Sequence, residues 1–160
     1  MESELSGFGK LFRVLSAING WSLVIVGGLS LMASLAFGAW VGAAISLAAA
    51  FHGIVELVLR KRAQIGNQGD AVRWMALNQL GLAASLSVYF AYQVMILDSD
   101  ALSLALMQPP LSDLLSLYPE STRSQLVDTL PLLIGAFYAL VAGVSWVACG
   151  ATAIFYWKQR

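Results

Sequence analysis

Apolar residues fill three long stretches of the chain, and their lengths predict how often it crosses a membrane. Between Trp21 and Leu59 the only ionisable residues are His52 and Glu56. One helix needs about 20 residues to cross a bilayer, so this stretch predicts two spans joined by a tight turn at Gly38. The other two stretches predict one span each, and Thr129 and Pro131 mark the start of the second of them, because proline favours the first turn of a helix. The four predicted spans cover residues 20–37, 40–59, 74–97 and 131–157.

The segments outside these spans are amphipathic or polar. Residues 4–18 carry apolar side chains at helical spacing, while Lys10 and Arg13 fall outside that stripe. A short basic helix before a span is typical of the headgroup layer, although the same pattern would arise if the first span extended into water. Residues 60–73 are polar and predict a loop. Residues 98–130 are rich in leucine and interrupted by prolines, which predicts two or three short amphipathic helices on the outer surface.

The basic residues lie almost entirely on one side of a four-span arrangement, and Arg123 is the one exception. Because basic residues are retained in the cytoplasm, both termini and the 60–73 loop are predicted to lie there. A count of three or five spans would scatter these charges over both sides. The residues on the predicted cytoplasmic side are Lys10, Arg13, Arg60, Lys61, Arg62, Arg73, Lys158 and Arg160.

Composition agrees with a membrane protein. The chain is 59% hydrophobic and 11% charged, whereas a soluble domain is roughly 45–50% apolar and about 25% charged. We therefore predict an all-α integral membrane protein, a four-helix transmembrane bundle in the cell (inner) membrane, with residues 1–160 forming one domain. The net charge of zero argues against a nucleic-acid partner. The expected partners are membrane lipids and other membrane subunits or further copies of the chain.

Motifs of soluble enzymes are missing from the sequence. It contains no phosphate-binding loop, no H-E-x-x-H and no G-x-S-x-G. Its one cysteine, Cys149, excludes an intrachain disulfide and a cysteine-based metal site. We therefore expect no enzyme activity, no catalytic residue, no metal site and no cofactor.

One pair of ionisable residues lies inside a predicted span. His52 and Glu56 are four residues apart, so they share one face of a helix. The 74–97 span enters from the cytoplasmic side, which places Asn78 and Gln79 at a similar depth. We predict that these four residues form a cluster in the cytoplasmic third of the bundle. An ionisable side chain costs about 2.5–3.5 kcal/mol at the centre of a membrane helix, so such residues are functional candidates by default.

Several interpretations of this cluster stay open. Glu56 precedes Arg60 by four residues and could form an ion pair with it among the headgroups, and His52 could be a hydrogen-bonded core residue. Alternatively, the two side chains could exchange protons or bind a passing cation. Ligation of a metal or haem by His52 would need further ligands, which the chain lacks in register.

A stripe of polar residues continues along the third and fourth predicted spans. Small and hydroxyl residues of this kind are typical of contacts between membrane helices, which makes packing the first interpretation and a path or pocket the second. The stripe comprises Ser85, Tyr89, Tyr92, Tyr138, Ser145 and Thr152.

Three classes of function remain compatible with the sequence. The first is a structural or accessory subunit of a larger membrane complex, which needs only packing from the polar residues. The second is a homo-oligomeric proton or cation channel or carrier that uses His52 and Glu56, with the acidic 98–130 segment attracting cations. The acidity of the 98–130 segment has an alternative explanation, because retention of basic residues on the cytoplasmic side leaves an excess of acidic residues outside. The third is a lipid- or cofactor-binding membrane protein.

Overall fold

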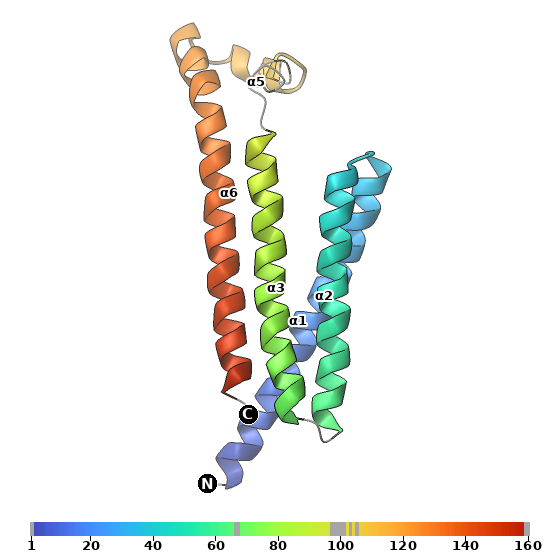
Figure 1. The fold of residues 1–160 in the computed structure, drawn as a ribbon. Coiled ribbons are helices and arrows are strands. Elements are labelled where there is room, and N and C mark those ends of the chain that lie inside the picture. The colour runs from blue at the N-terminus through green and yellow to red at the C-terminus, as the bar shows by residue number, and fades with distance from the viewer. Residues whose placement is uncertain (1, 66–67, 97–101, 103, 105, 159–160) are drawn as a thin grey trace. The chain divides into compact units, whose positions relative to one another are not determined.

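The computed structural model describes the chain except for residues 1, 66–67, 97–101, 103, 105 and 159–160, with side chains from Arg13 onward except that of Gln68. Every regular element in this part of the chain is an α-helix (Figure 1). The helices are α1 (Glu2–Ala36), α2 (Trp40–Gln64), α3 (Gln68–Met95), α5 (Leu111–Ser116) and α6 (Glu120–Trp157). Their contacts define two compact units. Unit 1 comprises Met1–Leu86 and Ser145–Arg160, and unit 2 comprises Ser87–Val144.

Three helices are long and apolar enough to cross a membrane: Arg13–Ala36 within α1, all of α2, and α6. Only 17%, 22% and 6% of the residues in their apolar windows are buried within the protein, and so much uncovered apolar surface fits contact with lipid. The prediction of an all-helical chain with membrane-length apolar helices is thus confirmed for the described residues. Helix α3 is not among the three, so the predicted 74–97 span stays a prediction.

Helix α3 is less apolar than these three spans, and two of its polar side chains in unit 1, Asn78 and Gln79, face protein. Val72 and Met75 have no exposed surface, and Gln79 and Asn78 are only 2% and 8% exposed. A helix that is covered by its neighbours can carry amides without placing them against hydrocarbon tails. Asn78 and Gln79 lower the hydropathy of α3, but because they are buried in unit 1 they do not have to face lipid.

Helices α1 and α2 form a closely packed hairpin (Figure 1). The chain reverses at Gly38, whose φ of 68° lies in the left-handed region that favours glycine, and this is where the sequence predicts the turn. The two helices also approach closely at Gly27. A Cβ atom added there would lie 2.7 Å from the backbone nitrogen of Ala50.

The first helix differs from the prediction, because α1 is continuous where the sequence predicts an interfacial helix over 4–18 and a separate span over 20–37. The two predicted segments meet at Asn19 and Gly20, where α1 continues without interruption and Gly20 lies against α2. A Cβ atom on Gly20 would lie 2.8 Å from the Leu57 side chain and 3.3 Å from the backbone oxygen of Gly53. Close helix packing therefore overrides the weak helix propensity of glycine.

The connection between α2 and α3 is shorter than the predicted 60–73 loop. Helix α2 continues to Gln64, and α3 begins at Gln68. The added turns are stabilised by burial of their apolar residues in a core cluster that includes Ala63 and Val72. Lys61 and Arg62 lie in the last turn of α2, where positive charge interacts favourably with the helix dipole.

The described part of the predicted outer segment, 98–130, includes the short helix α5 and the start of a long one. Residues 97–101, 103 and 105 lie outside the described residues, so the two or three amphipathic helices stay a prediction. Helix α6 begins at Glu120, so the sequence places the start of this helix too late by choosing Pro131, which lies inside it.

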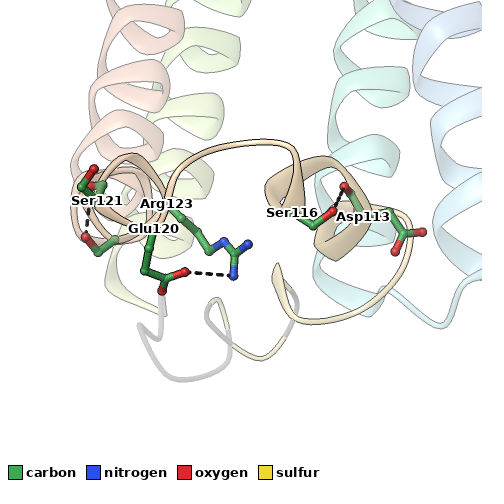
Figure 2. A network of polar contacts seen from close by, with 6 residues as sticks. Asp113, Ser116, Glu120, Ser121 and Arg123 are labelled. Atoms are coloured by element: carbon green, nitrogen blue, oxygen red, sulfur yellow. Dashed lines mark hydrogen bonds and ion pairs between the residues drawn. The ribbon is translucent and has the colours of Figure 1, made fainter.

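Local polar contacts stabilise the beginning of α6 in unit 2. Figure 2 shows Arg123 paired with Glu120 one turn earlier, at 3.3 Å. An acidic residue in the first turn also complements the helix dipole. On α5, the Ser116 hydroxyl donates to the backbone oxygen of Asp113 at 2.6 Å (Figure 2).

One end of unit 1 brings together the last turns of α2 and α6 and the first turns of α3. Their shared core includes Leu59 from α2, Met75 from α3 and Tyr156 from α6. Five of the nine basic residues of the chain occur in or next to these turns. They are Arg60, Lys61, Arg62, Arg73 and Lys158.

Candidate functional site

Glu56 lies at the centre of unit 1 and has no exposed surface. Its Oε2 atom accepts hydrogen bonds from Asn78 Nδ2 at 3.3 Å and from Gln79 Nε2 at 3.1 Å. Its Oε1 atom accepts a hydrogen bond from the Tyr156 hydroxyl. A buried carboxylate from α2 is thus satisfied by side chains from α3 and α6, and these bonds tie three helices together.

Asn78 links this carboxylate to His52. Asn78 Nδ2 also donates to the backbone oxygen of His52 at 3.0 Å, while Asn78 Oδ1 lies 2.8 Å from His52 Nδ1. Two acceptors, the His52 carbonyl and Glu56 Oε2, face the Asn78 side-chain amide. Its NH₂ group must therefore point toward them and its oxygen toward His52 Nδ1. His52 Nδ1 therefore carries a hydrogen and donates a hydrogen bond to Asn78 Oδ1.

The other nitrogen of His52 faces Ser85 on α3, with Nε2 and the Ser85 hydroxyl 3.5 Å apart. The Ser85 hydroxyl also lies 3.0 Å from the backbone oxygen of Gly81, so its one hydrogen can be donated to either of these two acceptors. Gly81 also makes room for the imidazole, because a Cβ atom there would lie 3.2 Å from His52 Cε1. We call the connected residues His52, Glu56, Asn78, Gln79, Ser85 and Tyr156 the Glu56 network.

The four residues proposed from sequence as a cluster, His52, Glu56, Asn78 and Gln79, all belong to this network. The alternative ion pair between Glu56 and Arg60 does not form. The guanidinium of Arg60 instead donates to the backbone oxygen of Arg13 on α1, at 3.2 Å.

The residues of the predicted polar stripe have different surroundings. Ser85 joins the Glu56 network, and the Thr152 hydroxyl donates to the backbone of its own helix, at Ala148. Ser145 is half-buried on α6. In unit 2, the Tyr89 hydroxyl accepts a hydrogen bond from Gln93, the Tyr138 ring stacks on Phe90, and Tyr92 is 40% exposed.

Two residues near the carboxylate were not predicted as part of the cluster. Tyr156 is absent from the predicted cluster, although it is 1% exposed and its hydroxyl reaches Glu56. Asn19 on α1 lies beside both of these side chains, and its Nδ2 atom is buried without a hydrogen-bond partner. The sequence feature that points to Asn19 is that it is the only residue with an amide side chain among residues 1–59.

Within the described part of the chain, no group of three or more His, Cys, Asp or Glu residues is arranged to hold a metal ion. No protein-family model, no curated protein and no solved structure matches the chain.

Proposed function

We propose that the chain crosses the cell (inner) membrane four times, with both ends in the cytoplasm. The 28 residues of α3 extend over about 42 Å, which exceeds the roughly 30 Å of a hydrocarbon core. Its amides Asn78 and Gln79 are buried in unit 1, so the polarity of these two side chains is no obstacle to a span. The basic turns at one end of unit 1 also fit a single cytoplasmic face.

We propose that this four-span protein carries protons across the membrane, with Glu56 as the group that binds and releases them. The observation that carries this proposal is a fully buried carboxylate whose hydrogen-bond donors are all neutral. Among the described side chains, no lysine or arginine is ion-paired with Glu56. A buried carboxylate that has no positively charged side chain beside it is suited to binding a mobile positive charge, such as a proton.

The orientation of the donors favours a proton over a metal cation as that partner. Asn78 and Gln79 turn their NH₂ groups toward Glu56, and the Tyr156 hydroxyl donates to it. A metal cation needs lone pairs from its ligands, whereas amide N–H groups present hydrogen. Reversal of the Asn78 amide would place its oxygen against two acceptors, so the site resists conversion into a cation cage.

The network also has an extent that suits transfer across the membrane. His52 lies about one turn from Glu56 on α2, and Ser85 lies seven residues, or about 10 Å, beyond Asn78 on α3. The titratable groups around Glu56 are His52 from α2 and Tyr156 from α6, while α1 and α3 contribute only amides. These two groups are the expected partners in proton exchange.

Proton flux into liposomes tests this proposal. Wild-type protein should dissipate an imposed pH gradient, and Glu56→Gln should reduce that flux to the level of empty liposomes. Glutamine preserves the shape of the side chain and an acceptor oxygen but does not titrate. Ser46→Ala is the control, because Ser46 is buried on the same helix and bonds only its own backbone, at Gly42. Equal flux from wild type and Glu56→Gln would remove this residue from any transport mechanism.

A second candidate, the accessory subunit of a larger membrane complex, is favoured by the closure of the same network. Both oxygens of Glu56 have donors within the chain. A purely structural role, in which the network holds α2, α3 and α6 together, is therefore enough to account for it. Extraction from the native membrane in mild detergent, followed by mass measurement, separates the candidates. Other polypeptides at fixed stoichiometry would support the subunit, whereas a homo-oligomer of this chain alone would support the carrier.

A further inference from the structure

An open cleft with a volume of about 380 Å³ lies between α1 and α6 in unit 1, and lining residues such as Leu15, Ile18 and Ser22 are exposed. Its polar lining residues are Asn19 and Ser22 from α1 and Thr152 and Tyr156 from α6, and Leu15 and Ile18 are among the apolar ones. We call it the α1/α6 cavity. Its volume is large enough for several water molecules, since one occupies about 30 Å³ in the liquid.

The hydroxyl groups of this cavity are arranged to receive water. Ser22 donates its hydrogen to the backbone oxygen of Asn19 at 2.9 Å, and Thr152 donates to that of Ala148 at 2.9 Å. Each hydroxyl oxygen therefore keeps lone pairs that can accept hydrogen bonds from water. Water in a protein cavity needs two to four such polar partners, and Ser22 and Thr152 supply two.

The cavity lies close to the basic end of unit 1. Leu15 follows Arg13 by two residues on α1, and Tyr156 precedes Lys158 by two residues on α6. Two residues correspond to about 3 Å along a helix axis. In the proposed topology, these bases mark the cytoplasmic headgroup region, so water can enter the cavity from the cytoplasm.

Tyr156 connects this cavity to the buried acid. It lines the cavity, and its hydroxyl donates to Glu56 Oε1. Glu56 itself has no exposed surface and does not line the cavity, so Tyr156 is the lining residue whose hydroxyl is hydrogen-bonded to the carboxylate.

We propose that the α1/α6 cavity is the cytoplasmic entrance for protons and that Tyr156 passes them to Glu56. A hydronium ion in the cavity gives one proton to Tyr156 Oη, while the hydroxyl's own proton moves to Glu56 Oε1. The hydronium becomes water, the phenol stays neutral and the carboxylate becomes a carboxylic acid. Release to the cytoplasm is the reverse of this step. The inference rests on the proposed role of Glu56 and adds the route by which it is reached.

The test measures how fast Glu56 takes up a proton after a pH jump, by time-resolved infrared spectroscopy of the reconstituted protein. The carboxyl band of Glu56 is identified by its loss in Glu56→Gln. Tyr156→Phe removes the relay hydroxyl but keeps the ring, and Ser22→Leu fills the cavity without contacting Glu56. Each should slow uptake at least about tenfold. Ser30→Leu, an exposed position on the same helix, should leave the rate unchanged.

This measurement does not depend on transport. Uptake at the wild-type rate in both Tyr156→Phe and Ser22→Leu would overturn the entrance, even if flux still requires Glu56. Wild-type protein without flux would instead contradict the proposed function and leave the uptake rates to decide the route. The chain has a single histidine, so the ¹⁵N signals of His52, with a proton on Nδ1, report whether each variant keeps the network. If Tyr156→Phe loses these His52 signals, the proton-uptake rate of Ser22→Leu decides whether the cavity is the entrance.

Discussion

Replacing Glu56 with leucine should destabilise the folded protein by about 2–5 kcal/mol. Leucine removes the carboxylate that accepts hydrogen bonds from Asn78, Gln79 and Tyr156, so three buried hydrogen bonds are lost, while Asn78 keeps its bond to the His52 carbonyl. An unsatisfied buried donor costs about 1–3 kcal/mol, although hydrogen bonds between membrane helices average only about 0.6 kcal/mol. Unfolding in mixed micelles with increasing dodecyl sulfate, followed by circular dichroism, measures the change.

Two matched variants make this prediction specific to the network. Glu56→Gln keeps an oxygen for the amides of α3, and its NH₂ group can donate to the Tyr156 hydroxyl, so most of the stability should remain. Ser46→Ala removes a buried hydroxyl that bonds only within α2 and should be nearly neutral. If Glu56→Leu were as stable as the wild type or more so, the acid would not hold the helices together. Such a result would also weaken the subunit proposal, because a burial that adds no stability needs a functional reason.

Alanine at Gly27 should destabilise the α1–α2 hairpin by about 1–3 kcal/mol, the usual cost of overpacking. Its Cβ atom would lie 2.7 Å from the backbone nitrogen of Ala50 and 2.9 Å from the backbone oxygen of Ser46. Backbone atoms cannot rotate aside as a flexible side chain can, so the two helices would have to separate. The same denaturation measurement detects the loss.

The neighbouring Gly28 provides the control for this substitution. A Cβ atom on Gly28 has nothing within 4 Å, so Gly28→Ala should be neutral or slightly stabilising. Both substitutions gain the helix propensity of alanine over glycine, about 1 kcal/mol in water. Their difference therefore isolates the cost of the contact. Equal stability of the two variants would show that α1 and α2 pack less closely at Gly27 than these distances indicate.

The Glu56 variants together separate structure from chemistry. The fold needs an acceptor at position 56, whereas the proposed transport needs a group that titrates. Glutamine supplies the first and lacks the second, and leucine lacks both. A stable Glu56→Gln protein without proton flux, beside an unstable Glu56→Leu protein, is the combination that the carrier proposal requires.

Local properties of the sequence determined the helices and much of the candidate site. The apolar lengths predicted membrane-length helices, and Gly38 marked the reversal between α1 and α2. The four-residue spacing put His52 and Glu56 on one helix face. These features depend on periodicity, length and backbone freedom, which are properties of neighbours along the chain.

Helix ends were less well predicted because packing with distant residues decides them. The sequence divides residues 4–37 into two segments, yet α1 continues through Gly20, which lies against α2. Pro131 reads as a helix start, yet α6 begins at Glu120 and continues through the proline. In each case a local propensity of a few kcal/mol or less was outweighed by contacts or helix continuation that the local pattern does not contain.

Only the tertiary structure decided which partners satisfy the buried acid. Tyr156 lies 100 residues from Glu56 along the chain, and its contact depends on how α6 is rotated against α2. The amide orientation of Asn78 likewise follows from acceptors on a second helix. A sequence pattern fixes which face of a helix is polar, but it does not fix which other face lies opposite. The pairing and rotation of helices settle that, because they depend on all of the contacts together.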